Sequence, residues 1–343
     1  MYFCQISTIT PMRFLRYQLL LLLFIPLLFS CNKELKVNAD WKDVTVVYGL
    51  LDQTSDTTYI KITKAFLGEG DALMFAKIAD SSNYPDKLEV RLDEYSDTTF
   101  KQSFPCDTIT VHNKKAGDSI FYYPDQLMYY TKAKLNEKYT YKLYIREKKT
   151  GKVITAQTSL VHDFTITRPQ GIASFPPGLE QMFEVTWSPA KMGKRYQLLI
   201  RFYYQEALKT NPDSLYMKSM DWLVFNNVKT IDNQSTLPFD LYFAGSSFYA
   251  IVGATIPADP RVDHRVAHHC YFIFTVAAPD LNTYMEVTEP SLSLVQEKPS
   301  FTNITNGIGL FSSRFIKFSD SLEISQITKD ALKVNDHTKN LGF

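Results

Sequence analysis

The sequence lacks the short motifs that mark many enzyme sites, and it carries no strong excess of either charge. Lys and Arg number 37 and Asp and Glu 36 in 343 residues, so the formal net charge is only +1. This near-neutral balance gives no electrostatic footprint for a nucleic-acid partner. No Gly-x-Ser-x-Gly, Gly-rich phosphate-loop, His-Glu-x-x-His or Cys-x-x-Cys pattern occurs. We therefore expect a protein that is not an enzyme and that uses no cofactor.

Long apolar runs and cysteines are also scarce. The apolar run at 19–29 spans about a dozen residues, whereas a membrane-spanning helix needs about 20. Of the four cysteines, Cys4 and Cys31 lie in the N-terminal segment, which leaves Cys106 and Cys270. These two could pair in an oxidising compartment, but they lie far apart in the chain, so we expect two separate thiols.

The N-terminal segment has the pattern of a secretory signal peptide that ends at a cysteine. Arg13 and Arg16 precede the apolar run, which closes with Leu-Phe-Ser-Cys at 28–31. These four residues resemble the lipobox of bacterial lipoproteins, in which the cysteine sulfur receives a diacylglycerol and becomes the new N-terminus. The resemblance implies cleavage before Cys31, and Asn32 favours sorting to the outer membrane. The alternative is an ordinary secretory signal followed by a coincidental cysteine.

Lipid attachment at Cys31 would hold the protein on a membrane. Acyl chains such as palmitate gain about 0.8 kcal/mol per buried methylene, so a multiply acylated cysteine binds a bilayer persistently. Beyond it, apolar residues alternate with polar ones in strand-like stretches such as 88–93, and aromatics make up 14% of the chain. We predict a signal peptide at 1–30, a tether at 31–42, an N-terminal β-sandwich domain at 43–162, a second β-sandwich domain at 163–289 and a C-terminal extension at 290–343 that packs on the domains.

Two local patterns resemble immunoglobulin-like and fibronectin type III sandwiches. At 135–143 a leucine, a tight turn and alternating tyrosines resemble the tyrosine corner, with Tyr139 or Tyr141 bonding back to the preceding backbone. A strand that ends in Trp187-Ser-Pro, followed by a strand led by Tyr196, is similar to strands B and C of fibronectin type III domains, which implies that both side chains pack in a core. The expected fold class is all-β, with two immunoglobulin/fibronectin type III-like β-sandwich domains, short helical insertions and a C-terminal tail.

Shorter patterns predict the remaining elements. Gly151 suits a positive-φ position in a hairpin turn. The polar stretch 208–219 is not assigned to an element. We expect strands at 221–225, 248–255, 271–276 and near 315–318, and a short helix at 328–332. The segment 71–81 is expected to form either a short helix or a lid-like insertion.

Several features together resemble one family. They are the lipobox at Cys31, the Val-Val-Tyr-Gly-Leu-Leu strand at 46–51, the segment 74–81, and the motif Asn-Ile-Thr-Asn-Gly-Ile-Gly-Leu-Phe at 303–311. The chain in this respect is similar to uncharacterised Bacteroidota lipoproteins whose genes often lie beside those for TonB-dependent outer-membrane transporters. The resemblance implies β-sandwich architecture and a cell-envelope role, and it brings no catalytic residues. The Asn/Gly motif favours a turn over a ligand site, because its glycines free the backbone.

An aromatic cluster is one candidate for ligand contact. Tyr122, Tyr123, Tyr129 and Tyr130 could stack on sugar rings. Tyrosines in such a stretch more commonly pack on sheet faces and loops, so both interpretations stay open.

A histidine cluster is the second candidate. His264, His268 and His269 could contribute to a zinc or copper site. The strand expected at 271–276 argues against it, because a strand that starts early would turn His268 and His269 to opposite faces. A solvated loop that leads into the strand is the commoner interpretation, and we expect no bound metal.

The leading hypothesis is a non-catalytic lipoprotein, lipid-anchored at the outer membrane on its periplasmic or outer surface. It would bind a partner protein, such as a TonB-dependent transporter, or a ligand delivered to that partner. One alternative is a glycan-binding surface module that uses exposed aromatics. Another is an envelope hydrolase whose carboxylates are dispersed in the sequence.

Overall fold

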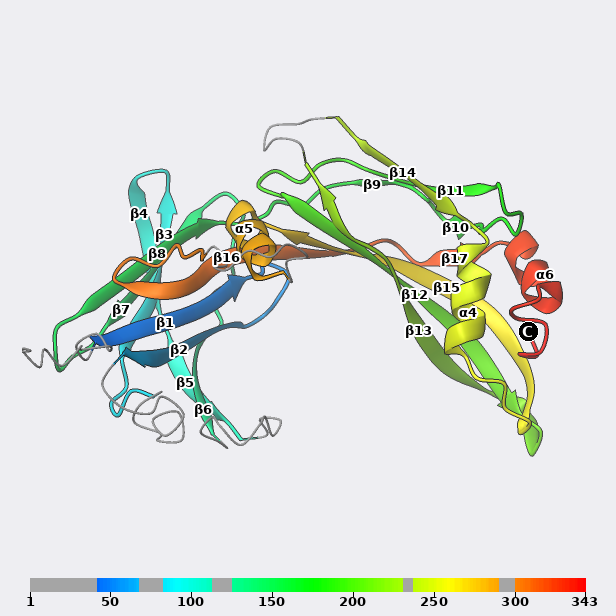
Figure 1. Ribbon diagram of the computed structural model, residues 1–343, viewed down its shortest axis with the longest axis horizontal. Helices are drawn as coiled ribbons and strands as arrows, with labels where there is room; N and C mark the ends of the chain where they lie inside the picture. The colour runs from blue at the N-terminus through cyan, green and yellow to red at the C-terminus, as the bar shows by residue number, and fades with distance from the viewer. Residues whose placement is uncertain (1–41, 68–82, 113–124, 231–236, 290–299) are drawn as a thin grey trace, which may run out of the picture. The chain divides into compact units, whose positions relative to one another are not determined.

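A computed structural model describes residues 42–67, 83–112, 125–230, 237–289 and 300–343 (Figure 1). Strands account for 54% of the described residues and helices for 11%, so the predicted all-β fold class is confirmed. The helices of this part of the chain are short: α4 (Ser247–Thr255), α5 (Pro279–Thr288) and α6 (Gln326–Val334).

The largest sheet has ten strands. They are β1 (Lys42–Leu51), β2 (Thr58–Leu67), β5 (Asp107–Val111), β6 (Gln126–Thr131), β10 (Ile172–Ala173), β12 (Arg195–Leu208), β13 (Asn211–Lys229), β15 (Val262–Ala277), β16 (Gly307–Phe318) and β17 (Leu322–Ile324). Their main path is β10-β17-β15-β16-β1-β2-β6-β5, and β12 joins β15 to β13 beside this path. The strand β16 is parallel to β1 and antiparallel to β15, so it connects the early and late strands of the chain.

The other strands named here form two smaller sheets. One has the order β4-β3-β7-β8 and the other the order β14-β11-β9. Their bounds are β3 (Glu89–Ser96), β4 (Thr99–Pro105), β7 (Thr140–Arg146), β8 (Val153–Ser159), β9 (Ile166–Arg168), β11 (Met182–Trp187) and β14 (Phe239–Ala244).

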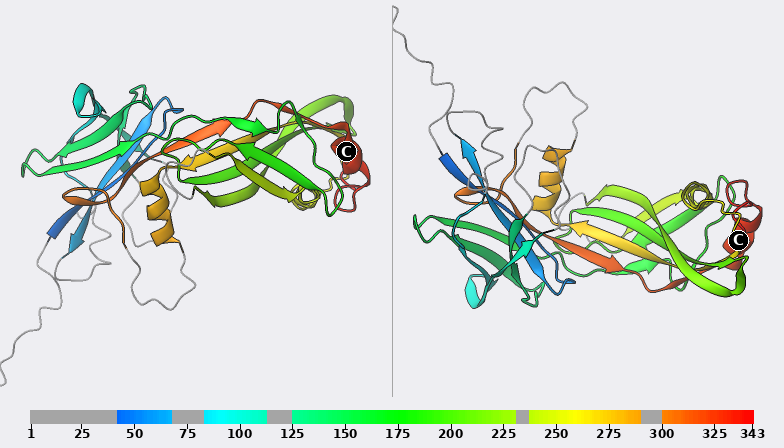
Figure 2. Two further views of the ribbon diagram at one scale, coloured as in Figure 1. Left: turned by 90° about the horizontal axis from the view of Figure 1, so that it is seen from above. Right: turned by 90° about the horizontal axis from the view of Figure 1, so that it is seen from below.

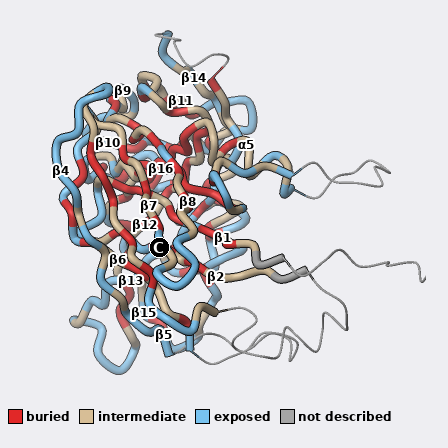
Figure 3. The backbone as a smooth tube through the Cα atoms, turned by 90° about the vertical axis from the view of Figure 1, so that its left-hand side faces the viewer, coloured by how far each residue is buried: buried red, intermediate tan, exposed pale blue. Residues whose placement is uncertain are grey.

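Buried apolar side chains form two clusters, as expected for sheets that face one another. Figure 3 marks the buried residues along the backbone. One cluster joins β1, β2 and β6 to β3, β7 and β8, and the other joins β12 and β15 to β11. Before β16, the residues of the first cluster end at Leu160 in the sequence, and those of the second begin at Val161. The strand β16 belongs to both, because Phe311 lies in the first cluster and Phe315 in the second. The division into two domains stays a prediction.

The hydroxyl of Tyr141 forms the predicted tyrosine corner. It accepts a hydrogen bond from the backbone N–H of Asn136 at 2.7 Å and donates to Glu94 at 2.8 Å. A second corner of the same kind occurs at Tyr196, whose hydroxyl accepts from the N–H of Ala190 at 2.7 Å. Tyr196 and Trp187 are both fully buried, as predicted.

The Asn/Gly motif serves the pairing of β16 with β1. The side-chain amide of Asn303 donates to the carbonyl of Phe311 and accepts from its N–H, at 2.7 and 2.9 Å. Gly309 has φ +115°, and a Cβ there would lie 2.0 Å from the carbonyl oxygen of Val47 on β1. Only glycine tolerates both conditions. The motif therefore has a structural role, as expected, but from Gly307 onward it forms a strand and not the expected turn.

Other expectations have mixed outcomes. The strands expected at 221–225, 271–276 and 315–318 lie within β13, β15 and β16, and the helix at 328–332 lies within α6. Gly151 has φ +73°, as expected for the hairpin turn between β7 and β8. The stretch 208–219 connects β12 to β13 and forms much of β13. The segment 71–81 lies outside the described residues.

The strand predicted at 248–255 is wrong, because these residues form α4. They are apolar nearly throughout, and such a run shows no periodicity that separates a strand from a buried helix. In the helix, Phe248 and Val252 are one turn apart, and both are fully buried.

Candidate functional site

The predicted aromatic cluster does not form one exposed platform in the part of the chain that is described. Tyr122 and Tyr123 lie outside this part, as does Cys31. Tyr129 is only 1% exposed, and its hydroxyl accepts a hydrogen bond from the N–H of Leu88 at 2.9 Å. The prediction that Tyr129 contacts a ligand is therefore corrected, because this ring belongs to the core.

Tyr130 lies next to Tyr129 on β6 and faces the opposite side of the sheet. It is half-buried, and its ring centroid is 6.2 Å from that of Tyr59 on β2. Tyr130 is thus a member of the predicted cluster that lies near an exposed aromatic side chain, that of Tyr59.

The three histidines lie on β15. The register with β12 shifts between Tyr203 and Tyr204, so that His269 is paired and His268 is not. This bulge brings the two rings to a centroid separation of 4.7 Å, and they do not take opposite faces as the sequence predicted. His264 contacts Asp263 at 2.9 Å.

Local packing explains these histidines better than a metal does. The ring of His269 stacks on Tyr203 at 4.6 Å, and burial, followed by the neighbouring charge of His268, lowers its pKa. Within the described ranges, no three His, Cys, Asp or Glu side chains are grouped so that they could hold a metal ion.

Cys106 and Cys270 are separate free thiols, as predicted. Burial raises the pKa of each thiol to about 12. Neither is a reactive thiolate near neutral pH.

A groove lies where α5 meets the outer face of the largest sheet, and we call it the tyrosine groove. In Figures 1 and 2, α5 lies beside β16. Leu310 and Arg314 of β16 line the groove. The groove has a volume of about 580 Å³, within the range of small-molecule sites. Its lining is mostly aromatic and apolar: Tyr48, Tyr59, Met128, Leu281, Tyr284, Met285 and Leu310.

Alternation along the strands explains why these side chains point outward. On β1, Val47 and Leu51 face the core and leave Tyr48 and Leu50 on the outer face. On β2, Ile60 is fully buried, whereas Tyr59 is 49% exposed. Strand pairing extends this outer face sideways to further exposed apolar side chains, which are Ile109, Val111 and Ile308.

One end of the tyrosine groove is polar. Arg314 on β16 forms an ion pair with Asp52 at 3.4 Å. Asp52 is 5% exposed, and it also accepts hydrogen bonds from the N–H and hydroxyl of Thr54. The groove thus combines a wide apolar wall with the Asp52–Arg314 ion pair, and Lys61 also lines it.

The aromatic wall of the groove is itself ordered. The rings of Tyr48 and Tyr284 meet edge to face at 6.1 Å, and the hydroxyl of Tyr284 donates to that of Tyr48 at 3.3 Å. This hydrogen bond, followed by partial burial, raises the pKa of Tyr48 to about 12. The phenol is neutral at physiological pH and offers a ring face and a hydroxyl.

Ion pairs hold α5 at its C-terminal end. Glu286 on α5 and Glu289 directly after it bond to Lys229 and Arg195, at 2.5 and 2.6 Å. These ion pairs fix one side of α5, while Tyr284 and Met285 line the tyrosine groove. Sequence reasoning missed the groove, although the outward tyrosines at 48 and 59 were a readable signal.

The comparisons with known proteins assign no family. No protein-family model matches the chain, and no curated protein matches it. Among the described residues, no helix combines the length and apolar character needed to cross a membrane.

Proposed function

We propose that this protein is a non-catalytic, lipid-anchored lipoprotein of the outer membrane that binds a partner protein, and that the partner is a TonB-dependent transporter. The observation that carries the proposal is the Leu-Phe-Ser-Cys motif at 28–31, placed directly after a short apolar run and shortly before the first strand. The family resemblance supplies the transporter as the partner.

The position of the cysteine supports a role close to a membrane. The strand β1 begins at Lys42, so the tether at 31–42 spans at most roughly 40 Å even when fully extended. Acylation of Cys31 would therefore keep the β structure within reach of an integral membrane protein.

The tyrosine groove supports the choice of a protein partner. Tyr, Met and Arg are enriched at the centres of protein–protein interfaces, and Tyr and Arg supply many of the side chains that dominate binding energy. The groove contains Tyr48, Tyr59, Tyr284, Met285 and Arg314. We propose that this surface contacts the transporter.

The anchor is tested by Cys31→Ala in the native host. We expect loss of radiolabelled palmitate incorporation and release from washed membranes, while the circular dichroism spectrum of the purified chain is unchanged. Membrane association that survives the substitution would overturn the anchoring part of the proposal.

The partner is tested separately by affinity purification from detergent-solubilised envelopes, with mass spectrometry of the bound proteins. We expect a TonB-dependent transporter to copurify with the native chain and to be lost with Tyr59→Ser. A matched control is Tyr216→Ser, because Tyr59 and Tyr216 are 49% and 52% exposed but Tyr216 is on β13, away from the groove. If no transporter is recovered, the proposed partner is wrong. If both variants lose the transporter equally, the tyrosine groove is not the contact surface.

A further inference from the structure

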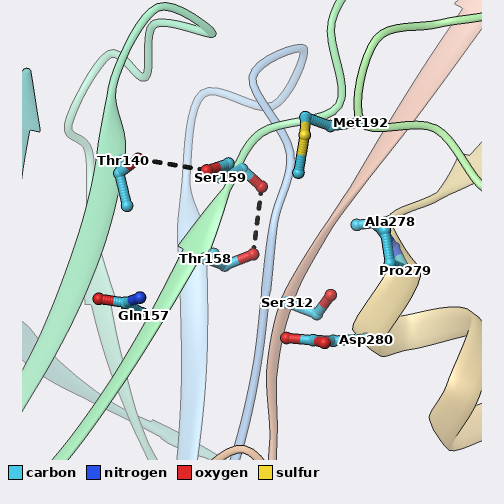
Figure 4. A pocket seen from close by; sticks show the side chains of 9 residues that line it. All are labelled: Thr140, Gln157, Thr158, Ser159, Met192, Ala278, Pro279, Asp280 and Ser312. Carbon is cyan, nitrogen blue, oxygen red and sulfur yellow. Dashed lines mark hydrogen bonds between the residues drawn. The ribbon is translucent and has the colours of Figure 1, made fainter. Parts of the chain in front are cut away.

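A second, smaller pocket is polar where the tyrosine groove is apolar, and we call it the hydroxyl pocket. It has a volume of about 190 Å³. Figure 4 shows Ser312, Thr158 and Asp280 around one space, with the side chain of Met192 reaching toward it. Its lining comes from β7, β8, β16, the start of α5 and the turn before β12: Thr140, Gln157, Thr158, Ser159, Met192, Ala278, Pro279, Asp280 and Ser312.

The hydroxyl of Ser312 is the unusual feature of this pocket. Ser312 is 0% exposed, and its Oγ has no hydrogen-bond partner among the described residues. The next residue, Ser313, is equally buried, but its hydroxyl donates to the carbonyl of Ser159 at 2.7 Å. A buried hydroxyl that has no partner costs about 1–3 kcal/mol, and native structures rarely keep one without a reason. Ser312 lines the hydroxyl pocket, so this unmet hydrogen-bonding group lies at the pocket wall.

The carboxylate of Asp280 is held in position from behind. It accepts a hydrogen bond from the amide of Asn303 at 2.8 Å, and the same amide is bonded to the backbone of Phe311. The wall formed by Asp280 is thus tied to the pairing of β16 and does not depend on a flexible side chain. A fixed carboxylate accepts hydrogen bonds from ligand hydroxyls.

The charge of the lining argues for a neutral ligand. None of the nine lining residues is Lys, Arg or His. The N-terminus of α5 borders the pocket, but Asp280 occupies its first turn and offsets the positive end of the helix dipole. An anion would meet this carboxylate with no cation to balance it.

Size and hydrogen-bonding capacity narrow the ligand further. A volume of 190 Å³ corresponds to about six water molecules at liquid density, which is the scale of one small molecule. Serine and threonine hydroxyls and the Gln157 amide both donate and accept, as the hydroxyls of a polyol do. We propose that the hydroxyl pocket binds a neutral polyhydroxylated small molecule, no larger than a monosaccharide, through Ser312 and Asp280.

The test uses the full chain in detergent and a panel of hexoses, pentoses and linear polyols at millimolar concentration. Saturation-transfer NMR detects binding, and calorimetry measures its affinity. We expect at least one neutral member of the panel to bind, and glucuronate, as an anionic probe, to bind more weakly than glucose. Absence of binding by every member would mean that the pocket holds only water, and the proposal would fail.

Two neighbouring serines provide matched variants. Ser312→Ala removes a hydroxyl that has no protein partner, so the unfolding midpoint does not fall, while affinity for the bound probe drops about tenfold. Ser313→Ala removes the bond to Ser159, so the midpoint falls, while affinity is kept. Unchanged affinity in Ser312→Ala would overturn the assignment even if a probe binds. The affinity for the small-molecule probe does not depend on the proposed transporter partner. If no transporter binds the protein, the hydroxyl pocket can still bind the probe.

Discussion

At the scale of single residues, the buried hydroxyl of Tyr141 makes a testable contribution to stability. Tyr141→Phe removes the acceptor of the Asn136 N–H and the donor to Glu94, and Glu94 is only 3% exposed. We expect the free energy of unfolding to fall by about 2 kcal/mol, measured by urea denaturation. Tyr139→Phe is the matched control, because it alters the neighbouring tyrosine of the same turn. Equal losses in both variants would show that the corner is not the cause.

The same residues show what a sequence pattern can and cannot specify. The alternating tyrosines predicted a corner, but only the structure distinguishes Tyr141 from Tyr139. Tyr129 and Tyr130 differ by one position, and period-two alternation says only that they face opposite sides. Which of them faces the core depends on the pairing of β6 with β2 and β5, and this pairing is set by residues far away in the chain.

At the scale of elements, the parallel pairing of β16 with β1 depends on Gly309. Gly309→Ala would place a Cβ 2.0 Å from the carbonyl oxygen of Val47, at a backbone φ of +115°. We expect a loss of about 3 kcal/mol or more in chemical denaturation, because the strain and the clash add. Gly151→Ala is the matched control: Gly151 has φ +73° but nothing within 4 Å of its Cβ position. It should lose only about 1 kcal/mol, and a similar loss at both sites would contradict the close approach.

The elements also show where local patterns run out. Alternation at 88–93 was enough to predict the strand β3, since Val90 and Leu92 on one of its faces are buried. The role of the 303–311 motif could not be read in the same way, because its partner β1 lies more than two hundred residues earlier. The largely apolar run at 248–255 carried no usable period and was predicted to be a strand, although it lies in α4. The tyrosine groove needs β1, β2, β6, α5 and β16 together, so no single stretch of sequence could specify it.

At the scale of the whole molecule, β16 determines how the two hydrophobic clusters depend on each other. Phe311 is fully buried in one cluster, and Phe315, four residues further along the same strand, is buried in the other. The same strand pairs with β1 at one end and with β15 at the other. If either cluster unfolded alone, β16 would have to leave a sheet that the other cluster needs. We therefore expect both clusters to unfold in one cooperative transition, even though larger proteins often unfold in steps.

Two probes distinguish one transition from two. Two of the three tryptophans, Trp187 and Trp222, belong to the second cluster, so with Trp41 replaced by Phe the tryptophan fluorescence reports the unfolding of that cluster. Hydrogen exchange in peptides from β3 and β7 reports the first cluster. Leu143→Ala lies on β7, within the first cluster only, and should cost about 2–5 kcal/mol. With one transition, this variant lowers the midpoint of the tryptophan signal as much as that of the exchange signal. A tryptophan midpoint that stays at its native value would show that the clusters unfold separately and that β16 does not couple them.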